Sequence, residues 1–143
     1  MMSKGKIVGI YIARVKNTPS DTVREAIAVS GKGLVGDRSY IAGNTRQVLV
    51  MDKETLDELG LEMGQIKENI TTAGLDLSRA KEGKVFSISE KVKLEITAPC
   101  KPCSKMDSIR PGLQSQLEGR RGVLATVTDG GAIQIGDTIN INL

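Results

Sequence analysis

The chain has 143 residues, of which 39% are hydrophobic and 26% charged, and its formal net charge is +3. These values are typical of one folded domain, here expected over residues 1–143, and argue against disorder. Aromatic residues make up 2% and tryptophan is absent, which argues against a protein that stacks nucleic-acid bases on aromatic side chains. The weak positive charge fits a small anionic ligand, and we expect no nucleic-acid partner.

The first half of the chain is typical of short strands separated by glycine turns. Asp52 is a good N-cap for a short helix through residue 59, and Gly60 is a stop signal after it. The glycine loop 31–36 matches no phosphate-binding motif and is more often a turn than a phosphate cradle. The predicted strands of this half cover residues 6–15, 23–29, 46–51 and 69–72.

The second half predicts a hairpin, because residues 84–89 and 92–98 flank a turn at Glu90-Lys91, and apolar and polar residues alternate in the second arm. A short helix is predicted over 111–118, with Pro111 at its first position. Two strands follow at 122–128 and 138–143. Many short strands, glycine turns and one or two short helices predict a mainly β protein with a compact β-barrel.

Two cysteines, Cys100 and Cys103, stand three residues apart in a chain that contains no histidine. The absence of histidine excludes Ser/His and Cys/His nucleophile–base pairs, and two thiols are too few for a structural zinc site. Three interpretations remain: sulfur chemistry, ligation of a soft metal, or a buried pair of small side chains. Lys101 and Lys105 are near in sequence, and positive charge stabilises a thiolate.

No stretch approaches the length of a membrane span, and the apolar run near the start lacks a clean cleavage site. We therefore expect a cytoplasmic protein with no membrane partner. In a reducing compartment, a C-x-x-C pair more often works as thiols than as a structural disulfide.

Charged and polar residues elsewhere give weaker signals. Arg46 opens an apolar strand, where it reaches either an anion or solvent. Asn69 bonds either a ligand or its own turn. Arg120 and Arg121 are either solvated, which is the more common case, or face an anionic ligand or partner.

In their order along the chain, these motifs resemble the MOSC domain family, named for the C-terminal domain of molybdenum cofactor sulfurases. The resemblance covers roughly residues 6–143. The matching runs are Gly36-Asp37-Arg38, Arg46-Gln47-Val48, Glu68-Asn69-Ile70-Thr71-Thr72-Ala73-Gly74, Pro99-Cys100-Lys101-Pro102-Cys103, Arg120-Arg121-Gly122-Val123, Gly130-Gly131 and Gly136-Asp137.

The resemblance implies a compact β-barrel like that of pyruvate kinase, in a small stand-alone bacterial protein. It makes Cys103 the working residue, which in the family is proposed to carry a persulfide or to ligate molybdenum. It also implies the molybdenum cofactor (molybdopterin) as ligand, with no pyridoxal phosphate bound by this chain. By position, the residues implied to line the cofactor are Thr45, Arg46, Lys67, Asn69 and Lys101.

Two departures from the family pattern weigh against a self-sufficient reductase. Family members often carry histidine after the Gly-Asp-Arg run, where this chain has Ser39 and Tyr40. Some reductase members have tyrosine in the strand that follows the Arg-Gly run, where this chain has Leu124.

Three functions from different classes follow from the resemblance. The first is a sulfur carrier that receives sulfur from a cysteine desulfurase or another donor and serves a partner in molybdenum-cofactor biosynthesis or a molybdoenzyme. The second is a molybdenum-dependent reductase of N-hydroxylated compounds with separate electron-donor partners. The third is a non-catalytic module that binds the cofactor and delivers it.

Overall fold

The chain forms a mainly β structure with three short α-helices, and the computed structural model describes residues 2–142. The helices are α1 (Lys53–Glu58), α2 (Lys105–Ile109) and α3 (Leu113–Gln116), with a 3₁₀ turn η1 at Leu77–Arg79. The strands are β1 (Met2–Ile12), β2 (Asp21–Val23), β3 (Glu25–Val29), β4 (Gly33–Leu34), β5 (Val48–Asp52), β6 (Ile70–Ala73), β7 (Val85–Ile88), β8 (Val92–Pro99), β9 (Val123–Asp129), β10 (Gly131–Gln134) and β11 (Thr138–Asn142).

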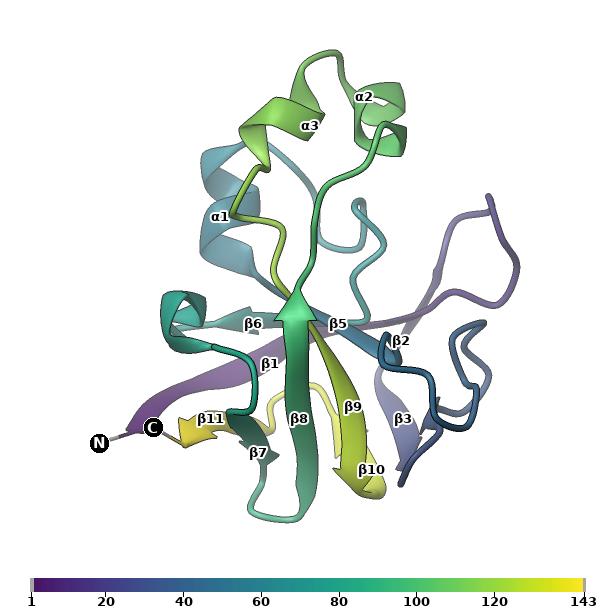
Figure 1. Cartoon of the computed structure of the whole chain (residues 1–143), viewed down its shortest axis with the longest axis vertical. Helices are drawn as coiled ribbons and strands as arrows, with labels where there is room; N and C mark the ends of the chain where they lie inside the picture. Colours follow the sequence, from purple (N-terminus) through teal and green to yellow (C-terminus); the bar gives the residue numbers. More distant parts are fainter. Residues whose placement is uncertain (1, 143) are drawn as a thin grey trace.

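Seven strands close into a barrel in the order β11-β7-β8-β9-β5-β6-β1, and β1 pairs with β11 to complete the circle. The β5–β6 pair is parallel, whereas β1 is antiparallel to both of its barrel neighbours. β2 extends the end of β1, and β10, β3 and β4 form a smaller sheet beside the barrel (Figure 1). Closure leaves the barrel strands without free edges.

β1 pairs with three strands, β11, β6 and β2, and it bends at an irregularity in its pairing with β6. Its first half pairs with β11 and its second half with β6, and the β6 register shifts between Ile7 and Gly9. Gly5 permits the close approach at this bend, since a Cβ there would lie 2.5 Å from the carbonyl oxygen of Ala73. Such a bulge sharpens the curvature that a small barrel needs.

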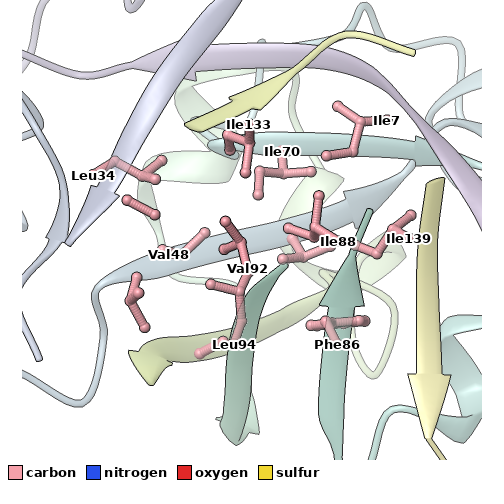
Figure 2. Close-up of a cluster of buried hydrophobic side chains, with 14 of the residues drawn as sticks. Ile7, Leu34, Val48, Ile70, Phe86, Ile88, Val92, Leu94, Ile133 and Ile139 are labelled. Carbon is pink, nitrogen blue, oxygen red and sulfur yellow. The ribbon is translucent and has the colours of Figure 1, made fainter. Parts of the chain in front are cut away.

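The barrel interior is filled by aliphatic side chains and Phe86, which is the one phenylalanine of the sequence. Ile7, Ile70, Ile88 and Ile139 point into this core from four different strands (Figure 2). Burying each such side chain contributes about 1.5–3 kcal/mol of hydrophobic free energy.

A second apolar cluster lies under the helices, which gather beyond the tip of β8 (Figure 1). Leu56 of α1, Met106 of α2 and Leu113 of α3 are all buried in it, together with Met51 from β5. The helices thus cap one end of the molecule. α1 follows β5, and the chain passes from β8 through α2 and α3 to β9. Within residues 2–142, no helix reaches the length and apolarity needed to cross a membrane.

Two predicted elements are confirmed closely. The hairpin forms as β7 and β8, with Val92, Leu94 and Ile96 buried on one face. The helix at 52–59 forms as α1, and the side chain of Asp52 accepts a hydrogen bond from the backbone N–H of Thr55 over 3.0 Å.

Other predicted elements are wrong in detail. The strand expected at 23–29 is split into β2 and β3, because the chain leaves β1 at Arg24 and joins the smaller sheet. The helix expected at 111–118 shortens to α3, because Gly112 takes a left-handed conformation with φ of 85°. Strand β10 and helix α2 were not predicted, since one is four residues long and the other five.

Candidate functional site

Both cysteines line one cavity of about 380 Å³ beside the end of β8, a size within the usual range for small-ligand sites. Its wall combines the loop after β1, the loop after β4, the start of β5, the approach to β6 and the segment from β8 to α2. Five cationic side chains line it, and we call it the cationic cavity. These are Arg38, Arg46, Lys67, Lys105 and Arg121.

The single acidic side chain of the lining, Asp37, is already occupied by hydrogen bonds. Its Oδ1 accepts from the backbone N–H of Ala13 over 2.8 Å and from the Asn69 side chain over 3.0 Å. Its Oδ2 accepts from the backbone N–H of Ser39 over 3.0 Å. The remaining charge of the wall is positive, so the cavity suits an anion.

Asn69 fixes three parts of the wall. Its Nδ2 donates to the carbonyl of Tyr11 over 3.1 Å and to Asp37, while its Oδ1 accepts from the backbone N–H of Leu49 over 2.9 Å. Both amide hydrogens are therefore used within the chain. Asn69 lines the cavity and also shapes it by holding β1, β5 and β6 together.

The two cysteines of the motif lie in different surroundings. Cys100 is 3% exposed and packs against Leu49 and Leu124, while Cys103 is exposed. Both are free thiols. The carbonyl of Cys103 accepts from the backbone N–H of Met106 over 3.0 Å, which begins α2. The interpretation as a buried pair is therefore wrong for Cys103, which solvent and ligands can reach.

Arg121 is buried, contrary to the more common case of a solvated pair. It is 9% exposed; its Nη1 donates to the Sγ of Cys100 over 3.0 Å and its Nη2 to the carbonyl of Ile66 over 2.9 Å. Its Nε is buried with no hydrogen-bond partner among the described residues. Arg120 points elsewhere and pairs with Glu58 over 2.7 Å. Adjacent arginines in a sequence are usually both exposed. Here the fold buries Arg121 and leaves its neighbour Arg120 at the surface.

Lys67 reaches the cavity from a strained turn. Its φ is +69°, a conformation in which few residues other than glycine are found, and its Nζ donates to the carbonyl of Thr18 in the loop after β1. The adjacent Glu68 is fully buried, and its Oε2 accepts from the backbone N–H of Gly64 over 2.8 Å and from Thr71 Oγ1 over 2.7 Å. This buried carboxylate holds the turn that presents Lys67.

The structure brings together most of the sequence-predicted site residues. Cys103, Arg46, Lys67 and Asn69 line the cationic cavity. Thr45 and Lys101 are exposed and lie outside its lining. Their predicted contact with a cofactor therefore needs a ligand that extends beyond the cavity.

Two lining residues, Arg38 and Lys105, were missed as ligand contacts by sequence reasoning, and for Arg121 contact with an anion was the less favoured of two alternatives. The signal for Arg38 was present in the Gly-Asp-Arg run. Leu124, which stands where some family members carry tyrosine, forms part of the apolar wall behind Cys100.

A larger and more open hollow of about 690 Å³ lies beside α1 and η1. It is lined by acidic residues such as Asp52 and Glu54 as well as by Arg120, and contains neither cysteine. Its size alone does not make it the site, because the reactive side chains lie in the cationic cavity.

Comparison with known proteins identifies the class of this barrel. The family model described as "MOSC domain" matches residues 37–140, and the chain belongs to the MOSC domain family. This is a class of domains associated with the molybdenum cofactor or with bound sulfur. A sequence search of curated proteins found no match.

Solved structures share the fold at low sequence identity. The YuaD protein of Bacillus subtilis superposes with a TM-score of 0.83 at 22% identity, over 99% of this chain and 97% of that one. YiiM from Escherichia coli gives a TM-score of 0.72 at 20% identity, over 98% of this chain and 70% of that one. YiiM from Geobacillus stearothermophilus gives 0.75 at 18% identity, over 100% and 76%. These likenesses establish the fold.

Proposed function

We propose that this chain is a sulfur carrier, with Cys103 as the thiol that holds a persulfide inside a cation-lined cavity. The observation that carries the proposal is the pairing of an exposed cysteine with five cationic side chains around one hollow. A persulfide anion is a nucleophile at neutral pH, and nearby cations stabilise its charge.

The cations also provide a binding surface for the sulfur donor and for the sulfur acceptor. Arg38 and Arg46 come from the loops on one side of the cavity, and Lys67 and Lys105 from other segments of its wall. Guanidinium groups bind carboxylates and phosphates with paired hydrogen bonds. A desulfurase or another sulfur donor, and an acceptor in molybdenum-cofactor metabolism, are the partners that fit this chemistry.

The molybdenum cofactor itself fits the same residues. Molybdenum is a thiophilic metal, Cys103 offers a soft ligand, and the cations suit the phosphate of a pterin. When bound, the cofactor would supply redox and oxygen-transfer chemistry at the metal. In that case Cys103 would hold the metal, while Arg46 and Lys67 would orient the phosphate. Reduction of N-hydroxylated compounds would then need a separate electron donor.

Native mass spectrometry on protein purified without oxygen tests the proposal. The informative forms are Cys100→Ser, which leaves Cys103 as its one thiol, and the double variant Cys100→Ser/Cys103→Ser. Sulfur carriage predicts the mass of an added sulfur atom in the first and its loss in the second. If Cys100→Ser instead carries the mass of a pterin–molybdenum cofactor and the double variant does not, the chain binds the cofactor through Cys103 and the sulfur-carrier proposal is wrong. A ligand retained equally in both variants would reduce the chain to a binding module in which Cys103 has no role.

A further inference from the structure

Cys100 has surroundings that packing alone does not explain. It lies against the apolar Leu49 and Leu124, yet its sulfur accepts a hydrogen bond from the guanidinium of Arg121 over 3.0 Å. A small apolar side chain in this position would need no such partner. The contact gives the sulfur of Cys100 a cationic partner inside the fold.

Arg121 supports this assignment independently. It is about nine-tenths buried, and its Nε has no hydrogen-bond partner within residues 2–142. A buried cation is costly unless an anion lies beside it, and the carboxylate of Asp37 is bonded to Ala13, Ser39 and Asn69. Arg121 donates to two atoms, the carbonyl oxygen of Ile66 and the sulfur of Cys100. Of these, the sulfur is the one that can carry a negative charge and so offset the buried cation.

The two thiols share a cavity and a spacing. Both line the cationic cavity, Cys100 from its buried wall and Cys103 from its exposed side. C-x-x-C spacing is typical of cysteine pairs that alternate between dithiol and disulfide. Here the pair sits at the exit of a barrel strand.

We infer that Cys100 is the resolving thiol of this site, converting the persulfide on Cys103 into free sulfide; the inference rests on the proposed function. The thiolate of Cys100 attacks the sulfur that is bonded to Cys103 Cβ. A bond forms between the sulfurs of Cys100 and Cys103, and the sulfur–sulfur bond of the persulfide breaks. The outer sulfur takes up the proton that the Cys100 thiol gives up and leaves as hydrosulfide. The two cysteines lose two electrons to the outer sulfur, so atoms and electrons balance.

This step has a chemical purpose. The outer sulfur of a persulfide is two electrons more oxidised than sulfide, which is the form that a metal centre takes as a sulfido ligand. A second thiol supplies those electrons at the place where the sulfur is held. An external dithiol then reduces the Cys100–Cys103 disulfide and restores the site.

The test charges the whole chain, without oxygen, with one equivalent of inorganic polysulfide. Released sulfide is counted above the amount found with Cys100→Ser, which undergoes the same charging reaction, and Cys100→Ser/Cys103→Ser is the blank for the reagent. The intact mass is taken after alkylation. Wild-type protein should release about one sulfide per chain and should carry an internal disulfide in place of two alkylated thiols. Cys100→Ser should keep the added sulfur and release it only when a dithiol is supplied.

The experiment distinguishes failure of the resolving role of Cys100 from failure of sulfur carriage at Cys103. If wild-type protein keeps its added sulfur for as long as Cys100→Ser does, with no disulfide, the inference is overturned and the proposed function stands. If Cys100→Ser takes up no sulfur although its circular dichroism spectrum is that of the wild type, the proposed function falls, and the inference with it. The wild-type measurement needs no variant, and Cys100→Ala provides a second form should Cys100→Ser fold poorly.

Discussion

The side-chain amide of Asn69 donates a hydrogen bond to the carboxylate of Asp37 over 3.0 Å, and both side chains are 7% exposed. This bond joins the loop after β4 to the start of β6, and it continues through Asn69 to β1 and β5. The wall of the cationic cavity is therefore braced by a buried polar network, which keeps the cations in place around the thiols.

Removing this brace should cost stability. Asn69→Ala leaves the backbone N–H of Leu49 and the carbonyl of Tyr11 buried without their partner, and each such group costs about 1–3 kcal/mol. We expect the free energy of unfolding in urea to fall by about 3 kcal/mol. The exposed Asn142→Ala is the control, with an expected change below about 0.5 kcal/mol. Equal effects of the two substitutions would show that the network does not brace the wall.

Glu68 should be needed for stability although it touches no ligand. Glu68→Ala leaves the backbone N–H of Gly64 and the hydroxyl of Thr71 without an acceptor, at about 2–4 kcal/mol for the two donors together. Glu68→Gln keeps an acceptor oxygen, so its loss should be smaller. Thermal unfolding of the three proteins measures the difference, and a Glu68→Gln variant less stable than Glu68→Ala would contradict the assigned role.

Stability should decline at high pH through Tyr11. Burial, and secondly the negative charge of Glu68, raise the pKa of Tyr11 above its ordinary value of 10.0. The folded state thus holds the phenol proton more tightly than the unfolded state does. The resulting stabilisation is fully present below pH 10 and is lost as the pH rises from there through the raised pKa.

The measurement is urea unfolding of wild type and Tyr11→Phe at a series of pH values up to the alkaline limit of folding. Other groups titrate in the same range in both proteins, so the difference between them isolates Tyr11. We expect the wild type to lose more stability than Tyr11→Phe above pH 10. Parallel curves would contradict the raised pKa.

The cations of the cavity should accelerate reaction of Cys103 with anionic reagents. A dianionic aromatic disulfide should react faster than a neutral one of similar size, and added salt should narrow the gap. Arg46→Ala or Lys67→Ala should lower the ratio of the two rates by roughly twofold to tenfold. Lys101→Ala, a cation outside the lining, serves as the matched control. If Lys101→Ala lowered the rate ratio as much as Arg46→Ala does, the anion would bind outside the cavity, near Thr45 and Lys101.

The fold was predictable where local signals agree with the final structure. The β7–β8 hairpin followed from alternation, and α1 followed from the Asp52 cap and Gly60. Strand β10 was not predicted because it has four residues and begins at the second of two glycines, Gly130 and Gly131, so its pairing with β3 decides its structure. Local patterns cannot report a strand that exists because of a distant partner.

The candidate site was predictable in part, for a similar reason. The motif order pointed to Cys103, Arg46, Lys67 and Asn69, which the fold brings to one cavity. The burial of Arg121 could not be read from the sequence, because arginine is mostly exposed and its pairing with Cys100 spans 21 residues. The same applies to the contrast between a buried Cys100 and an exposed Cys103.

The most direct test of the account is sulfur uptake at a single defined thiol. Cys100→Ser and Cys100→Ser/Cys103→Ser would be exposed to isotopically labelled polysulfide without oxygen, and peptides would then be mapped by mass spectrometry. Sulfur carriage at Cys103 predicts label on the peptide that contains this residue, close to one sulfur per chain, and none in the double variant. Equal label in both variants, or none in either when both are folded, would contradict a carrier role for Cys103.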